Sequence, residues 1–180
     1  METQRLVLRP WKETDAEALF ELARDPQIGP SAGWRPHVSK ANSLKALREV
    51  LIKPGEYAII EKTTGAIIGS IGVIPSQRSI IGGLQEEDLT IGFWIGRDRW
   101  DQGFATEAAD AVLNEAFSDS KISNVWASSF EGNHRSERVQ EKLGMEYKFS
   151  EFIVHPLLHE ACMINVSCIS REKYQQKTDN

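Results

Sequence analysis

Residues 100–108, Trp-Asp-Gln-Gly-Phe-Ala-Thr-Glu-Ala, have the residue types of an anion-binding turn. An apolar, strand-like run ends shortly before them at Ile95, and an alanine-rich helical pattern follows. A glycine turn from a strand into a helix leaves several backbone N–H groups without intrahelical acceptors, at the positive end of the helix dipole. The segment therefore predicts a site for a phosphate or a pyrophosphate.

The common phosphate-binding motifs do not describe this turn. It has no Lys followed by Ser or Thr, as a Walker loop requires, and no G-x-G-x-x-G dinucleotide pattern is present. The phosphate ligand must therefore be of another kind. A second interpretation stays open, in which Gly103 simply allows the helix to pack closely on a sheet.

A second segment, residues 133–145, opens another helix directly after a strand. Helical spacing places Asn133, Ser136, Gln140 and Leu143 on one stripe and Arg135, Arg138 and Lys142 on another. The first stripe could present an amide and a hydroxyl to a ligand, and the second could meet phosphates. In the alternative interpretation, Asn133 is only an N-cap and the cations form a solvated face.

The elements that must position these segments follow from hydrophobic periodicity. Amphipathic patterns predict a helix after Thr14, one after Ser39, and helices over 106–117 and 133–143. Alternating or apolar runs predict strands over 4–9, 57–61, 66–74, 88–95, 124–129, 147–154 and 161–170. The order predicts a mixed α/β (α+β) fold, with one domain over 1–170 and a polar, frayed tail over 171–180.

Composition narrows the class of protein. The chain has 180 residues and a formal net charge of -5, which argues against nucleic-acid binding. Four His and two Cys are too dispersed for a metal site. Cys162 and Cys168 are expected as buried thiols, and a disulfide between them is the alternative. We expect no membrane association and a cytoplasmic location, since no apolar run is long enough to span a bilayer.

Together the two segments resemble the GNAT superfamily of acyl-coenzyme A-dependent N-acetyltransferases, in particular its RimJ/RimL branch of ribosomal-protein N-acetyltransferases. Residues 100–108 are similar to a W-x-x-G-x-A-T-E-A form of motif A, and 133–144 to an N-x-x-S-x-R-V-x-E-K-L-G form of motif B. Residues 3–11 and 33–37 resemble the branch's first strand and early loop. The resemblance runs from about Arg5 to Ser170. It implies a mostly antiparallel sheet of about seven strands flanked by about four helices.

The resemblance also implies acetyl-coenzyme A as cosubstrate, with no metal. The backbone of Phe93, Trp94 and Ile95 would pair with the pantetheine arm as an added strand does. Asn133 would hydrogen-bond the pantetheine, with Arg138 and Lys142 near phosphates. Backbone N–H groups would hold the pyrophosphate at Gln102, Gly103, Phe104, Ala105 and Thr106.

Members of this family transfer acetyl directly to an amine, so a base and an acid are needed. Many members place a tyrosine acid where this chain has Gln140, and Ser136 is the natural substitute; a purely local helix role for Ser136 stays open. The branch often has a glutamate base where this chain has Thr90. We favour Asp88 or Glu87 as base. The alternatives are an ordered water and the side chains of Glu151, His155 and His159.

The expected acceptor is a primary amine, either a protein N-terminal residue or a small amine such as an antibiotic or a polyamine. The aromatic loop with Trp34 and His37 is expected to shape that choice, and core packing is the alternative for Trp34. The enzyme is expected to be a monomer or a homodimer. The competing hypothesis is a catalytically inactive coenzyme A-binding sensor or interaction module.

Overall fold

Seven β-strands form one sheet in the computed structural model, which describes residues 1–178. The strand order is β1-β2-β3-β4-β5-β7-β6, where β4 and β5 are parallel and β1/β2, β2/β3, β5/β7 and β6/β7 are antiparallel. This confirms the mixed, mostly antiparallel sheet expected from the sequence. The strands are β1 Leu6–Pro10, β2 Glu56–Glu61, β3 Ile67–Pro75, β4 Leu89–Ile95, β5 Asn124–Phe130, β6 Glu146–Val154 and β7 Ala161–Ser170.

The described part of the chain has six α-helices, two more than the sequence patterns predict. They are α1 Ala16–Ala23, α2 Gly29–Ala32, α3 Lys40–Ala46, α4 Phe104–Ser118, α5 His134–Lys142 and α6 Arg171–Thr178. The four-residue α2 has the sequence Gly-Pro-Ser-Ala, which is too short and too polar to show helical periodicity. Three-residue helical turns lie at Glu13–Asp15, Ser76–Arg78 and Arg97–Arg99, and a five-residue π-helix follows α3 at Leu47–Leu51.

Residue contacts divide the chain into two compact units. Unit 1 contains Met1–Gly72 and Phe93–Ala108, and unit 2 contains Val73–Gly92 and the chain from Ala109 onward. The single domain over 1–170 stays a prediction.

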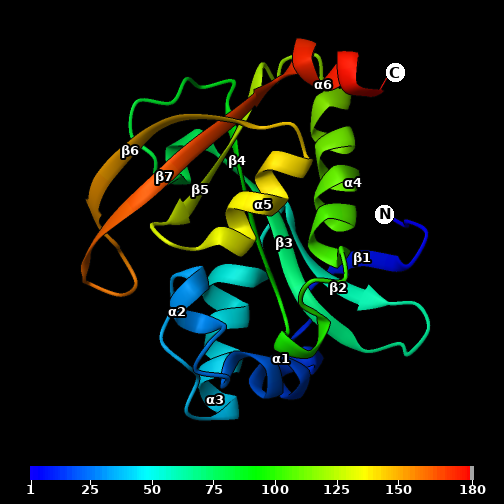
Figure 1. The fold of residues 1–180 in the computed structure, drawn as a ribbon. Helices are drawn as coiled ribbons and strands as arrows, with labels where there is room; N and C mark the ends of the chain where they lie inside the picture. The colour runs from blue at the N-terminus through cyan, green and yellow to red at the C-terminus, as the bar shows by residue number, and fades with distance from the viewer. Residues whose placement is uncertain (179–180) are drawn as a thin grey trace. The chain divides into compact units, whose positions relative to one another are not determined.

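Unit 1 has its core where α1 and the turn after α3 pack together (Figure 1). The buried residues of this core are Trp11, Ala16, Leu19, Ala23, Leu47 and Ala58. Ser39 caps α3, because its side chain accepts a hydrogen bond from the N–H of Asn42. The cap confirms the helix start expected at Ser39.

Unit 2 contains the long β6–β7 hairpin, which is drawn in orange beside β5 (Figure 1). One face of β5 and β7 packs against the loop between β3 and β4, with Ile81, Ile164 and Val166 buried. Cys168 is a buried free thiol and Cys162 a partly buried one, so no disulfide joins them. Burial raises the pKa of Cys168 to about 12.

The expected frayed tail is wrong for Arg171–Thr178, which forms α6. Tyr174 is only 4% exposed, and its ring lies 5.1 Å from that of Phe117. The Arg171 guanidinium donates to the carbonyl oxygens of Phe117 and Ile122. One aromatic residue and one arginine thus fix a segment that its polar composition suggested would be loose. Residues 179–180 of the expected tail lie outside the described residues.

Candidate functional site

The turn between β4 and α4 has the geometry of an anion cradle. Asp101 and Gly103 both have a positive φ, at 58° and 80°. The backbone N–H of Glu107 donates to the carbonyl oxygen of Gly103 at 3.0 Å, which begins the helical ladder. The N–H groups of residues 104–106 precede that bond and have no intrahelical acceptor. They are therefore placed to donate to an anion at the start of a fifteen-residue helix.

Glu107 anchors this turn to the N-terminal segment of unit 1. Its carboxylate accepts from the Thr3 hydroxyl at 2.5 Å, from the Arg5 N–H at 2.8 Å and from Arg5 Nε at 2.6 Å. Arg5 Nη1 also donates to the carbonyl oxygen of Gln102 at 3.0 Å, and its guanidinium lies 4.2 Å from the centre of the Phe104 ring. Burial favours a higher pKa for Glu107, but these hydrogen bonds outweigh it and the pKa is lowered.

Further contacts within unit 1 hold the turn from its other side. Trp100 Nε1 donates to the carbonyl oxygen of Ile95 at 2.7 Å, and Gln102 Nε2 donates to that of Asp98 at 3.0 Å. Arg99 makes two hydrogen bonds to Glu61 Oε2, which lower the pKa of Glu61. The turn is thus fixed through side chains, while its exposed residue Gln102 points away from the core.

The backbone of β4 presents its groups to two edges in alternation. The N–H of Gly96 donates to Ile68 of β3 at 2.7 Å, and a side chain at Gly69 of β3 would collide with the carbonyl oxygen of Trp94. Residues 94 and 96 therefore face β3, whereas Phe93 and Ile95 direct their backbone groups to the opposite edge. Of the three residues expected to pair with a ligand, Phe93 and Ile95 direct their backbone groups away from β3 and Trp94 directs its carbonyl toward it.

Gly92 lies in a central strand and is nevertheless exposed. A Cβ built on it meets no other group within 4 Å. Parallel pairing of β4 with β5 joins Leu89 to Val125 and Thr90 to Trp126. Gly92 lies just beyond these pairs, and the space around its built Cβ is open.

Trp34 and Trp94 are two predicted site residues that the structure brings together. Their rings pack edge to face, with centroids 5.3 Å apart at 67°. Trp34 Nε1 is buried and has no hydrogen-bond partner among the described residues. His37 instead bonds to Ser43, with Nδ1 2.8 Å from Oγ, and its burial lowers the pKa of the imidazole. The early loop therefore contacts β4 through Trp34.

On α5, Asn133 is the N-cap, and its Oδ1 accepts from the N–H of Ser136 at 3.3 Å. Gln140 is 2% exposed and donates from Nε2 to Ser136 Oγ at 3.2 Å. This bond uses a lone pair of the hydroxyl and leaves its hydrogen available to donate. Arg138 and Lys142 are exposed, as the stripe pattern predicts.

The two preferred base candidates have different surroundings. Asp88 is 2% exposed, and its two carboxylate oxygens accept from the N–H of Gln85 at 3.1 Å and from Asn124 Nδ2 at 2.9 Å. Glu87 is exposed. Thr90 is 7% exposed and donates to Ser79 Oγ at 2.8 Å.

Sequence reasoning missed the role of Thr3 and Arg5 in supporting the turn. The only sequence signal was an ordinary arginine at the start of a strand, 102 positions from its partner. Within residues 1–178, no group of three or more His, Cys, Asp or Glu side chains is arranged to hold a metal ion. No helix in that part of the chain is both long and apolar enough to cross a membrane.

Comparison with known proteins gives a family match over most of the chain. A family model described as an acetyltransferase (GNAT) domain matches residues 5–146. YkkB of Bacillus subtilis is 34% identical over 87 residues, so the match spans about half of that protein and 48% of this chain. The uncharacterized N-acetyltransferase p20 of Bacillus licheniformis is 27% identical, with 80% of each chain covered.

Solved structures have the same fold at low sequence identity. A GNAT-family acetyltransferase of Bacillus anthracis has a TM-score of 0.80 at 22% identity, covering 96% of this chain and 98% of that one. A proposed ribosomal-protein-serine acetyltransferase of Vibrio cholerae has 0.76 at 19%, covering 94% and 95%. AAC(6')-Ib in complex with ribostamycin and coenzyme A has 0.74 at 19%, covering 96% and 97%.

Proposed function

The chain belongs to the GNAT acetyltransferase family, and we propose that it transfers acetyl from acetyl-coenzyme A directly to a primary amine. The family uses acetyl-coenzyme A as acetyl donor. The observation that carries the proposal is the turn before α4, where Asp101 and Gly103 at positive φ turn the chain into the helix. This conformation supports the proposal, because the first N–H groups of α4 have no intrahelical acceptor and can donate to a pyrophosphate.

The residues present fit a coenzyme with a phosphate end and an amide-bearing arm. In the proposal, backbone N–H groups of Gln102, Gly103, Phe104, Ala105 and Thr106 hold the pyrophosphate. The outward backbone groups of β4 at Phe93 and Ile95 pair with the arm, and the open side of Gly92 supports this assignment. Between them, Trp94 contributes to the site through its ring, which packs against the ring of Trp34. On α5, Asn133 hydrogen-bonds the arm, and the exposed cations Arg138 and Lys142 meet phosphates.

Ser136 is proposed to donate its hydroxyl hydrogen to the sulfur as negative charge develops on it. Gln140 supports this role, because its buried amide holds Ser136 Oγ and leaves the hydroxyl hydrogen unused. A serine is a weak acid, so its contribution is a hydrogen bond that strengthens in the transition state. Gln140 is a positioning residue in this proposal.

The proton of the attacking ammonium is proposed to leave through Glu87 or Asp88. Glu87 is exposed and can receive a proton directly or through water. Asp88 has both oxygens engaged within unit 2, which supports a role in fixing the turn that presents Glu87. Replacing Glu87 by Gln should then lower kcat and shift its pH dependence, and Asp88→Asn should lower stability as well.

The acceptor is proposed to be a protein N-terminal residue, as in the RimJ/RimL branch, or a small amine. The Vibrio cholerae structure supports the first, and the ribostamycin complex supports the second. Trp34 and His37 are proposed to shape the acceptor side, supported by the unpartnered indole N–H of Trp34. A cytoplasmic location and a monomeric or homodimeric state remain predictions of the sequence.

Release of free thiol from acetyl-coenzyme A tests this function. The panel should contain peptides with free N-termini, aminoglycosides and alkyl polyamines, with N-acetylated peptides as control acceptors. Thiol release with a free amine and none with its acetylated form is the expected result. Tight coenzyme binding without turnover on any acceptor would instead favour the inactive sensor.

A further inference from the structure

Two buried polar atoms of opposite hydrogen-bonding type lie on one face of the sheet in unit 2. Trp126 Nε1, a donor, and Glu151 Oε2, an acceptor, are both buried and have no partner among the described residues. Trp126 pairs with Cys168 and Glu151 with Ile164. Since Cys168 and Ile164 are four residues apart on β7, both side chains rise from the same face.

The described residues packed on this face supply no hydrogen-bond partner for either atom. A buried donor or acceptor left unsatisfied is unfavourable, most of all when it belongs to a carboxylate. A mutual hydrogen bond would remove the penalty, yet the two side chains stand on strands that flank β7. Groups kept unpaired in a native structure call for a specific reason, and recognition of a ligand is one.

The loop between β3 and β4 covers the two atoms. Ile81 and Leu84 of this loop pack in the same cluster as Trp126. A Cβ built on Gly82 would lie 3.5 Å from Glu151 Oε1, an ordinary contact distance, so this loop lies directly over the carboxylate. Thr90 is paired with Trp126 and ties the start of the loop to β4 through Ser79.

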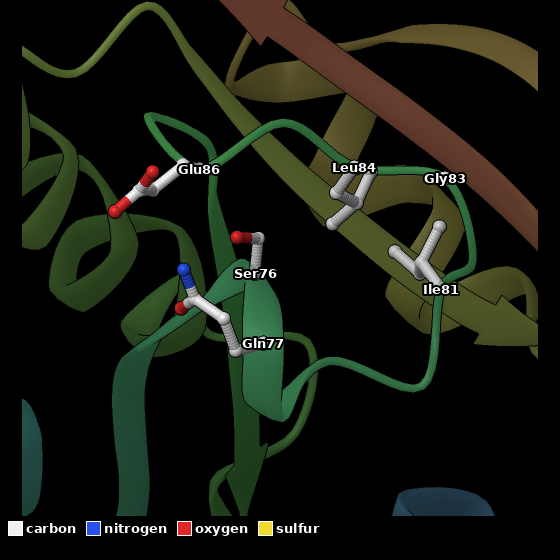
Figure 2. A pocket seen from close by; sticks show the side chains of 6 residues that line it. All are labelled: Ser76, Gln77, Ile81, Gly83, Leu84 and Glu86. Carbon is white, nitrogen blue, oxygen red and sulfur yellow. The ribbon is translucent and has the colours of Figure 1, made fainter.

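The same loop lines an open hollow of about 320 Å³. Figure 2 shows Ser76, Gln77 and Glu86 on one side of it and the apolar side chains of Ile81 and Leu84 on the other. Ile81 and Leu84 line this hollow and also pack in the cluster that contains Trp126, so this loop segment borders both. Movement of this one loop segment would connect the two.

The chemistry of the two atoms specifies their ligand. A carboxylate oxygen accepts from an ammonium group, and an indole N–H donates to an oxygen acceptor. The indole ring also attracts a cation to its face. We infer that Trp126 and Glu151 bind an amine acceptor that has both an ammonium group and a carbonyl or hydroxyl oxygen. A peptide N-terminus and an amino sugar both have this chemistry. The inference rests on the proposed function, because it assigns the acceptor of that reaction.

Kinetics of two variants test the assignment, with an alanyl tripeptide, a 2-amino sugar and 1,4-diaminobutane as acceptors. Glu151→Gln should raise KM at least about tenfold for all three, because each has an ammonium group. Trp126→Phe should raise KM for the first two only, because the diamine has no oxygen. The affinity for coenzyme A should stay within twofold of wild type in both. The acceptor with the lower KM, the peptide or the sugar, identifies which of the two classes is the natural acceptor.

Stability separates binding from a structural role. Replacing a carboxylate whose buried Oε2 has no partner within residues 1–178 should leave the melting temperature of Glu151→Gln unchanged or higher, whereas loss of a structural carboxylate would lower it. Glu131→Gln, which changes an exposed carboxylate just after β5, is the matched control and should alter neither property. An unchanged KM in both Glu151→Gln and Trp126→Phe would overturn the inference.

A direct readout keeps this test independent of turnover. The indole N–H resonance of Trp126, assigned by its loss in Trp126→Phe, should shift when the tripeptide is added in the presence of coenzyme A. If wild type shows this shift but no thiol release, the proposed activity fails and the binding site stands. If thiol is released while the resonance does not move, the activity stands and the site is wrong.

Discussion

Arg5 and Glu107 are joined twice across 102 positions of the chain, by the Arg5 N–H to Oε1 at 2.8 Å and by Nε to Oε2 at 2.6 Å. The same guanidinium holds the carbonyl oxygen of Gln102. One ion pair therefore links the first turn of α4 to the loop that precedes it. In the proposed enzyme, this pair fixes the direction of the N–H groups between them.

Glu107→Gln should weaken coenzyme A binding about tenfold, because a neutral amide holds the Arg5 guanidinium less firmly. Isothermal titration with coenzyme A measures the effect. Glu115→Gln, at an exposed position on the same helix, should bind like wild type. Equal affinities of the two variants would contradict a role for the Arg5–Glu107 pair.

Gly103→Ala should combine a loss of stability with a loss of coenzyme affinity. At φ 80° an alanine is strained by about 1 kcal/mol, equivalent to about 2–4 °C in melting temperature for a chain of this size. Gly65→Ala is the matched control, since Gly65 has φ 70° and nothing within 4 Å of its built Cβ. Both variants should melt earlier, and only Gly103→Ala should bind coenzyme A more weakly. A normal affinity in Gly103→Ala would argue against the cradle.

Ser136→Ala should lower kcat about 10- to 100-fold while the affinity for coenzyme A changes little, because the hydroxyl acts on developing charge. Gln140→Met, similar in size but unable to donate, should lower kcat by a smaller factor. Pre-steady-state thiol release measures the chemical step. Ser118→Ala, at an exposed serine ending α4, serves as control. A full rate in Ser136→Ala would leave the serine with only a helix role.

Stability should fall as the pH drops below about 6.5, the usual imidazole pKa. Burial lowers the pKa of His155 and of His37, so the unfolded chain binds protons there more readily than the folded one. Neutral His155 Nδ1 accepts from the N–H groups of Leu157 and Leu158, which protonation prevents. His155→Asn keeps an acceptor without titrating. Urea unfolding at pH 5.5 and 7.5 should show a smaller difference for this variant than for wild type.

The strands and longer helices were predictable because each has its own hydrophobic period. β7 matched its expected bounds, and Ser39 and Asn133 cap helices as their residue types indicate. α6 was missed because its stability comes from the distant partners Phe117 and Asp110 of Tyr174 rather than from a period. The pairing of Arg5 with Glu107 escaped prediction for the same reason.

The site was only partly predictable for a related physical reason. Motif residues such as Gly103 and Ser136 have local signals in spacing and turn type. The unpaired atoms of Trp126 and Glu151 have none, because whether a polar atom is satisfied depends on every element packed around it. Their positions became informative only once the register of β5, β7 and β6 was known.

The indole of Trp100 occupies the carbonyl oxygen of Ile95, which faces the edge of β4 opposite β3. In the proposed complex, an added strand would have to share the carbonyl oxygen of Ile95 with this indole. If the ligand strand shifted by two residues toward α4, it would lose a hydrogen-bond acceptor on β4. A shift by two residues in the opposite direction would not cause this loss. In this proposal Trp100 fixes the hydrogen-bonding register of the ligand on β4. Shortening its side chain should make the position of the acyl end less defined.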